Sequence, residues 1–133
     1  MTTFLDTNIL IALLNNQEQH HAWCVAQLGA CKLNGPALIS DIVYCEFSAG
    51  MASQAHVDAA IAQFALERMP SDDATLFRAG TAFRQYKANK GTKTNVLPDF
   101  LIGAIAEVAG APLITANAKD FTGYFPTLQL IAP

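Results

Sequence analysis

The feature that most constrains this chain is its N-terminal segment, residues 2–14, TTFLDTNILIALL. A short β-prone run stops at Asp6-Thr7-Asn8, and a longer apolar run of helical length follows. This order predicts a strand, a tight turn and a helix, with Asp6 at the carboxyl end of the strand. Ligands of open α/β sheets bind at that edge. Asp6 is therefore a candidate site residue, although an Asp in this place can also simply cap the helix.

The composition predicts one compact domain, residues 1–133, with a large buried core. Hydrophobic residues make up 52% of the chain and charged residues 14%. No apolar segment approaches the roughly 18 residues that a membrane span needs. The N-terminus lacks a signal-peptide pattern, because an acid interrupts its first apolar run. The three cysteines include no C-x-x-C pair, which is typical of a reducing compartment. We therefore expect a cytoplasmic protein that does not associate with a membrane.

Strand and helix patterns alternate along the rest of the chain. Helices are expected at residues 18–33, 41–51, 57–69, from a cap at Ser71 or Asp72 to about residue 91, and at 98–110; further strands are expected at 37–39, 111–115 and 128–131. Such alternation predicts the α/β class, as a three-layer α/β/α sandwich around a central, mainly parallel sheet. In that arrangement the carboxyl ends of the strands share one edge.

Two further carboxylates fall where they can reach the edge that bears Asp6. Glu46 lies on the apolar face of the helix expected at 41–51, and Asp99 opens the apolar helix at 98–110. A salt bridge at the helix rim would explain Glu46, and the helix dipole would explain Asp99. If both meet Asp6, however, the three carboxylates repel one another unless some are protonated or a cation binds.

The segment after the strand at 111–115 brings more oxygen ligands to the same edge. Thr115 ends that strand, and Asn117 and Asp120 follow it within five residues. Oxygen ligands suit Mg²⁺ or Mn²⁺, and such ions hydrolyse phosphodiesters by activating water. We therefore predict Asp6, Glu46 and Asp99 as catalytic and metal-binding residues, Asn117 and Asp120 as further metal ligands, and Asn8 and Thr115 as residues that support the ligands.

The basic residues are concentrated in one segment. The net charge of −3 argues against a general nucleic-acid coat. Yet five of the eight basic residues fall within residues 78–93, which contain no acid. We expect four of them to contact phosphates of a nucleic-acid substrate, namely Arg84, Lys87, Lys90 and Lys93. The alternative is a solvated face whose cations satisfy the C-terminus of a helix.

In order and spacing, the acid-bearing segments resemble those of the PIN-domain ribonucleases, and among them the VapC-like toxins of toxin–antitoxin pairs. The matching segments are FLDTNI at 4–9, the helix around Glu46, PDFLIGAIA at 98–106 and LITANAKDF at 113–121. The resemblance covers essentially the whole chain. It implies a PIN-like fold, an Mg²⁺- or Mn²⁺-dependent endoribonuclease, a homodimer, and a cognate antitoxin whose tail covers the acidic site. Many family members carry an acid where this chain has Asn117, so the fourth ligand is Asn117, Asp120 or absent.

Three other functions remain open from the sequence. Asp6 could accept a phosphoryl group in a phosphatase, although such motifs carry a second acid where this chain has Asn8. The acids could form a binding pocket without catalysis. The chain could also be a housekeeping RNA-processing nuclease that has no antitoxin.

Overall fold

Five parallel strands form the centre of the fold. The computed structural model describes residues 1–93 and 95–133, so Thr94, within the polar loop expected at 92–95, lies outside the described residues. The strands are β1 (Thr3–Leu5), β2 (Ala37–Ser40), β3 (Glu67–Met69), β4 (Leu113–Ile114) and β5 (Leu130–Ile131), in the spatial order β3-β2-β1-β4-β5. All four pairings are parallel, which confirms the α/β class and the parallel central sheet.

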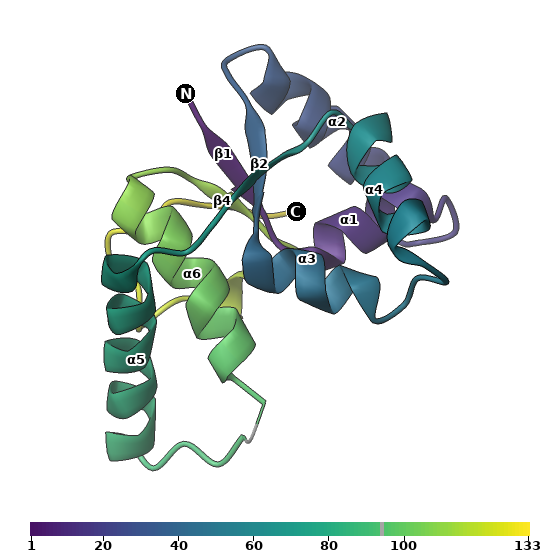
Figure 1. Cartoon of the computed structure of the whole chain (residues 1–133). Helices are drawn as coiled ribbons and strands as arrows, with labels where there is room; N and C mark the ends of the chain where they lie inside the picture. Colours follow the sequence, from purple (N-terminus) through teal and green to yellow (C-terminus); the bar gives the residue numbers. More distant parts are fainter. Residues whose placement is uncertain (94) are drawn as a thin grey trace.

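Helices cover both faces of this sheet and give the expected three layers (Figure 1). The helices are α1 (Thr7–Leu14), α2 (His21–Lys32), α3 (Asp41–Ser48), α4 (Gln54–Gln63), α5 (Asp73–Ala88) and α6 (Leu97–Ala109), with a short 3₁₀ turn, η1, at Ala118–Asp120. Helices α1, α2 and α4 lie toward one side, and α5 and α6 pack together on the other. Helix α3 contacts both α1 and α6, and so lies where the two helical layers approach each other.

Local sequence signals set several helix ends. Ser40 caps α3 by accepting a hydrogen bond from the backbone N–H of Val43, and Asp72 caps α5 through Thr75. Helix α6 stops at Gly110, whose φ of 66° is the left-handed conformation that glycine adopts without strain. Described helices of this chain lack the combined length and hydrophobicity that a bilayer span requires.

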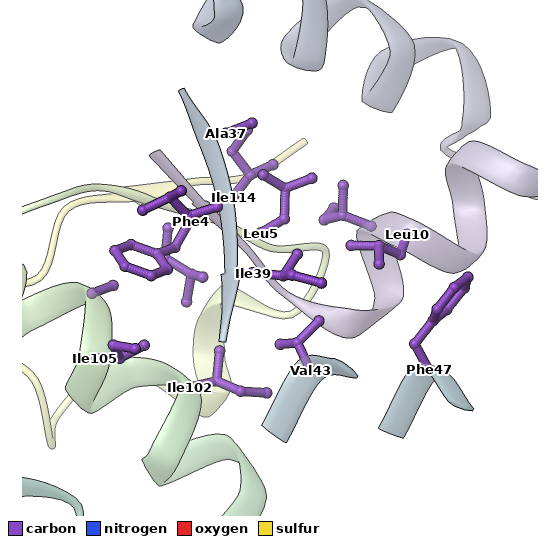
Figure 2. Close-up of a cluster of buried hydrophobic side chains, with 14 of the residues drawn as sticks. Phe4, Leu5, Leu10, Ala37, Ile39, Val43, Phe47, Ile102, Ile105 and Ile114 are labelled. Carbon is purple, nitrogen blue, oxygen red and sulfur yellow. The ribbon is translucent and has the colours of Figure 1, made fainter. Parts of the chain in front are cut away.

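The hydrophobic core packs against both faces of β1. Neighbouring side chains of a strand point to opposite faces. Figure 2 accordingly shows Phe4 on the side of α6, near Ile105, and Leu5 on the side of α1, near Leu10. Phe4 and Leu5 are each only 1% exposed. The strand that carries Asp6 is therefore fixed from both layers.

The helix expected at 57–69 is wrong in its second half. Helix α4 ends at Gln63, Ala65 has a positive φ of 50°, and β3 follows at the edge of the sheet. The Nζ of Lys32 donates to the carbonyls of Phe64 and Ala65 and so satisfies the end of α4. The three side chains of β3 are exposed, so the strand lacks the apolar pattern that would have revealed it.

Candidate active site

Predicted site residues lie near the point where the strand order of the sheet reverses. Strand β1 lies between β2 and β4, and the chain reaches these two neighbours through helices on opposite sides of the sheet. Such a switch point leaves a crevice at the carboxyl ends of the two central strands. Asp6 directly follows β1 and Thr115 directly follows β4. The backbone N–H of Asp6 donates to the carbonyl of Ile114 at 2.9 Å, which aligns the two ends.

Asp6 is a buried carboxylate that accepts three hydrogen bonds. It is 5% exposed. Its Oδ1 accepts the backbone N–H of Thr7 at 2.7 Å, and its Oδ2 accepts the Thr115 hydroxyl at 2.7 Å and the Asn8 amide at 3.3 Å. Asp6 does cap α1, but the donors from Thr115 and Asn8 go beyond what a cap needs. Burial raises the pKa of Asp6, the bonds from Thr115 and Thr7 oppose that rise, and the charges of Glu46 and Asp120 add to it.

Glu46 reaches the same crevice from α3. Its Oε1 accepts the Thr7 hydroxyl at 2.7 Å. Thr7 thus holds two carboxylates, Asp6 through its backbone and Glu46 through its side chain. We did not predict a role for Thr7, although its place directly after Asp6 was the available signal.

Asp99 stands in the first turn of α6 and completes the group. Burial raises the pKa of Asp99 to about 7, together with the charges of Asp120, Asp6 and Glu46, while Lys93 lowers it. No hydrogen bond to the Asp99 carboxylate comes from the described residues. The charges of three other acids, from three other segments of the chain, therefore act on Asp99.

Asn117 and Asp120, both in the loop after β4, have different surroundings. Asp120 lies in η1, and its charge raises the pKa of both Asp6 and Asp99. Asn117 has an exposed side chain, and its backbone N–H donates to the Thr115 hydroxyl at 3.0 Å. The amide oxygen of Asn8 accepts the N–H of Ala116 at 3.2 Å, which fastens the start of this loop to α1.

The acid group fits a divalent cation that brings ligands of its own. Within residues 1–93 and 95–133, no three His, Cys, Asp or Glu side chains are close enough to hold a metal ion by themselves. The charges of Glu46 and Asp120 nevertheless raise the pKa of both Asp6 and Asp99, so the four side chains are near enough to act on one another electrostatically. All the ligands are oxygens, and Mg²⁺ is commonly held by one or two carboxylates together with waters and substrate phosphates. The residues present fit such an ion.

A cavity of about 590 Å³ adjoins the acids. It is lined by Tyr86, Thr92, Lys93, Asn95, Val96, Asp99, Phe100, Lys119, Asp120 and Tyr124. Lys93 is the member of the predicted RNA contacts that lines it. Arg84, Lys87 and Lys90 are exposed along or just after α5, and Lys87 lies over the ring of Phe83 with its Nζ 5.3 Å from the ring centroid.

Lys119 and Arg78 were not among the predicted phosphate contacts, and they lie in different surroundings. Lys119 lines the cavity but was not predicted, although its place beside Asp120 was a usable signal. Arg78 points into the protein, where its Nε donates to Glu107 at 2.6 Å and its Nη2 to the carbonyl of Tyr124 at 2.6 Å. Arg78 therefore fixes the C-terminal segment against α6.

Comparisons with known proteins identify the family and the fold of this chain. Residues 3–123 match the family model of the PIN domain. No curated protein matches the chain. Among solved structures, a chain of VapBC2 from Rickettsia felis, bound to a DNA fragment from their promoter, is similar with a TM-score of 0.77 and 23% identity over 99% of this chain and 98% of that chain.

Two further structures show the same fold. A chain of a toxin–antitoxin complex from Klebsiella pneumoniae has a TM-score of 0.66 and 28% identity over 98% of this chain and 97% of that chain. A chain of DNA-bound VapBC from Salmonella typhimurium has a TM-score of 0.74 and 19% identity over 99% and 98% of the two chains. Because the family model spans nearly the whole sequence and the acids gather where this fold has its crevice, the chain belongs to the PIN-domain family.

Proposed function

We propose that this chain is an Mg²⁺- or Mn²⁺-dependent endoribonuclease, and that it is the toxin of a toxin–antitoxin pair. The observation that carries the proposal is that Thr7 joins Asp6 and Glu46 at the switch point of the sheet, and that the charges of these two acids and of Asp120 act on Asp99. PIN domains are nucleases, and the fold is that of chains from VapBC complexes. An acidic crevice of this kind can bring a cation and a phosphodiester together.

The donors around Asp6 and Glu46 explain how these residues would act. A divalent ion, when bound, supplies a water of lowered pKa and charge that stabilises the leaving oxygen. Asp6 would hold the ion with a carboxylate that Thr115 and Thr7 keep in place. Thr7 occupies Oε1 of Glu46, which leaves Oε2 to bind the ion or to accept a proton from the attacking water. Asp99, in the first turn of α6, would be a further carboxylate ligand.

We assign the fourth ligand to Asp120 and not to Asn117. The charge of Asp120 bears on both Asp6 and Asp99, and Asp120 lines the cavity next to the acids. The Asn117 side chain is exposed, and the backbone N–H of Asn117 donates to the Thr115 hydroxyl. In this assignment Asn8 and Thr115 orient the ligands without binding the ion.

The remaining proposals concern partners. The exposed cations Arg84, Lys87, Lys90 and Lys93 would contact RNA phosphates along the strand. Cleavage would leave 5′-phosphate and 3′-hydroxyl ends. By the resemblance to the VapC-like toxins, we also propose a single-domain protein that forms a homodimer in the cytoplasm and is inhibited by a cognate antitoxin.

The direct test is cleavage of a fluorescent single-stranded RNA by the purified chain. We expect cleavage with Mg²⁺ or Mn²⁺ and none with excess chelator. Cleavage that continues undiminished in chelator would reject the metal mechanism. A lack of cleavage with either ion, on folded protein and several RNA sequences, would favour a non-catalytic acidic pocket.

A second test separates a toxin from a housekeeping nuclease. Induced expression of the wild-type chain should stop bacterial growth, whereas Asp99→Asn should permit it. Coexpression of the product of the neighbouring reading frame should restore growth to cells that make the wild-type chain. Metal-dependent RNA cleavage without any growth defect would instead indicate a housekeeping enzyme.

A further inference from the structure

The cavity beside the acids combines three kinds of side chain. Its lining includes the acids Asp99 and Asp120 and the cations Lys93 and Lys119. The aromatic side chains of Tyr86, Phe100 and Tyr124 form the apolar part. Its volume of about 590 Å³ falls within the range of small-molecule sites, roughly 300 to 1,000 Å³.

Tyr86 fixes one wall of this cavity. Its ring packs edge-on against Phe100 and Tyr124, with centroid distances of 5.7 and 5.9 Å. The backbone of Gly91 passes directly against the same ring, where an added Cβ would overlap it. The hydroxyl of Tyr86 accepts the backbone N–H of Lys93 at 2.7 Å. A rigid aromatic cluster therefore holds the segment that brings Lys93 to the cavity.

The two lysines reach the cavity from separate parts of the fold. Lys93 follows α5, and Lys119 lies in η1 beyond β4. Lys93 is near enough to Asp99 for its charge to lower the pKa of that carboxyl. An anionic ligand in the cavity would thus meet a cation from each of two segments of the lining, which also includes Asp99 and Asp120.

We propose that this cavity binds one unpaired nucleotide of the RNA strand, next to the phosphate that is cleaved. The inference rests on the proposed ribonuclease function and adds Lys119 and Tyr124 to the substrate contacts. The base would lie against Tyr124 with the amide of Asn95 within the same lining, and the nucleotide's phosphate would lie by Lys93 and Lys119. Aromatic contact with an unstacked base and cations on its phosphate are the usual elements of single-strand recognition.

The first test is an NMR titration of the folded chain, in Mg²⁺, with the four nucleoside 5′-monophosphates and with ribose 5-phosphate. We expect at least one nucleotide to shift the amide signals of Lys93, Asn95 and Tyr124 and to bind more tightly than ribose 5-phosphate. Equal affinity for ribose 5-phosphate would reject a base site, and the absence of shifts at millimolar nucleotide would reject the cavity as a nucleotide site.

Replacing each of the two lysines separately by glutamine tests where the phosphate of the nucleotide binds. Lys119→Gln and Lys93→Gln should each weaken nucleotide binding by up to about fivefold, the effect of one partly exposed charge contact. Arg68→Gln is the matched control, because Arg68 lies on β3 and pairs with Asp41 away from the cavity. Equal affinities in Lys119→Gln and Arg68→Gln would show the assignment of Lys119 to be wrong.

Tyr86→Phe tests whether the Tyr86 hydroxyl positions Lys93 at the cavity, because the variant keeps the aromatic ring. The variant loses the acceptor for the Lys93 N–H, so it should weaken nucleotide binding, and the effects of Tyr86→Phe and Lys93→Gln should not add. Tyr44→Phe is the control, since its hydroxyl bonds to Asp58 outside the cavity. Strict additivity would contradict a positioning role for Tyr86.

The outcomes separate this inference from the proposed function. RNA cleavage without nucleotide binding in the cavity would leave the nuclease standing and overturn the subsite. Nucleotide binding that depends on both lysines, in a chain that cleaves no RNA with either ion, would support the subsite and reject the nuclease.

Discussion

The hydroxyl of Thr115 donates a 2.7 Å hydrogen bond to Oδ2 of Asp6, across 109 residues of sequence. This bond joins the carboxyl ends of β1 and β4 at the switch point of the sheet. Both residues are buried, Thr115 at 0% and Asp6 at 5% exposure. The orientation of the Asp6 carboxylate is therefore part of the folded structure before any cation binds.

Thr115→Val should test that relationship, because it keeps the shape of the side chain and removes the donor. The buried Asp6 carboxylate would lose one partner, so we expect the free energy of unfolding to fall by about 1 to 3 kcal/mol. RNA cleavage should fall as well. Chemical denaturation of Thr115→Val beside Thr81→Val, whose hydroxyl donates to the carbonyl of Phe77 within α5, gives the comparison. Equal losses in the two variants would contradict the role of Thr115.

The acid group should make the metal-free protein less stable as the pH rises. The pKa of Asp99 is about 7 in the folded protein against an ordinary 3.8, so the folded state retains a proton that the unfolded chain has released. Its contribution is complete below about pH 4 and is lost as the pH rises through 7. The raised pKa of Asp6 acts in the same direction.

Asp99→Asn cannot ionise and should lack this loss. Thermal melting in chelator from pH 5 to pH 8 should therefore show the melting temperature of wild type falling relative to that of Asp99→Asn. Asp73→Asn, an exposed acid in the first turn of α5, is the control and should follow wild type. A constant gap between wild type and Asp99→Asn across this range would show that the carboxylates do not interact as proposed.

A divalent cation should reverse the instability at neutral pH. An ion that binds only the folded state adds about 2.7 kcal/mol when its concentration is a hundred times the Kd. Mg²⁺ should thus raise the melting temperature of wild type and raise that of Asp99→Asn less. Differential scanning calorimetry with and without Mg²⁺ measures both shifts. Equal shifts in the two proteins would exclude Asp99 as a ligand.

The fourth ligand can be tested by a pair of changes in one loop. Asp120→Asn should weaken Mn²⁺ binding in calorimetry, whereas Asn117→Ala should change it little, since the Asn117 side chain is exposed. Asn117→Asp should tighten binding by adding a charge at the rim. If Asn117→Ala lost as much affinity as Asp120→Asn, the assignment to Asp120 would be wrong.

The basic segment predicts a dependence on salt. Replacing Lys87, Lys90 and Lys93 together by Gln should weaken RNA binding and flatten its salt dependence by at most about one unit of log–log slope per lost phosphate contact. Fluorescence anisotropy over a salt series, in chelator, measures the slope. An unchanged slope would assign these lysines to a solvated helix face.

Much of the fold was predictable because the N-terminal pattern and the buried helix α6 are strong local signals. Asp6 and Asp99 stand at the ends of such elements, so parallel topology alone directs them to one edge. Strand β3 was missed because its exposed residues carry no strand pattern, and its place is set by pairing with β2.

The finer details of the site depend on tertiary contacts. Our proposal of Asp120 instead of Asn117 as the fourth ligand depends on η1 and on the bond from the Asn117 backbone to Thr115, which no local pattern specifies. The role of Thr7 as a bridge to Glu46 requires α3 to pack beside α1. Lys119 joins Lys93 at the cavity because loops distant in sequence meet there.

The most direct test of the central claim is to measure Mn²⁺ binding and RNA cleavage on the same preparations of wild type, Asp6→Asn and Asp73→Asn. Asp6→Asn keeps the size of the side chain but removes the charge at the centre of the acid group. We predict that Asp6→Asn stays folded by circular dichroism and loses both Mn²⁺ affinity and cleavage, while Asp73→Asn keeps both. Metal-dependent cleavage at the wild-type rate in folded Asp6→Asn would contradict the account.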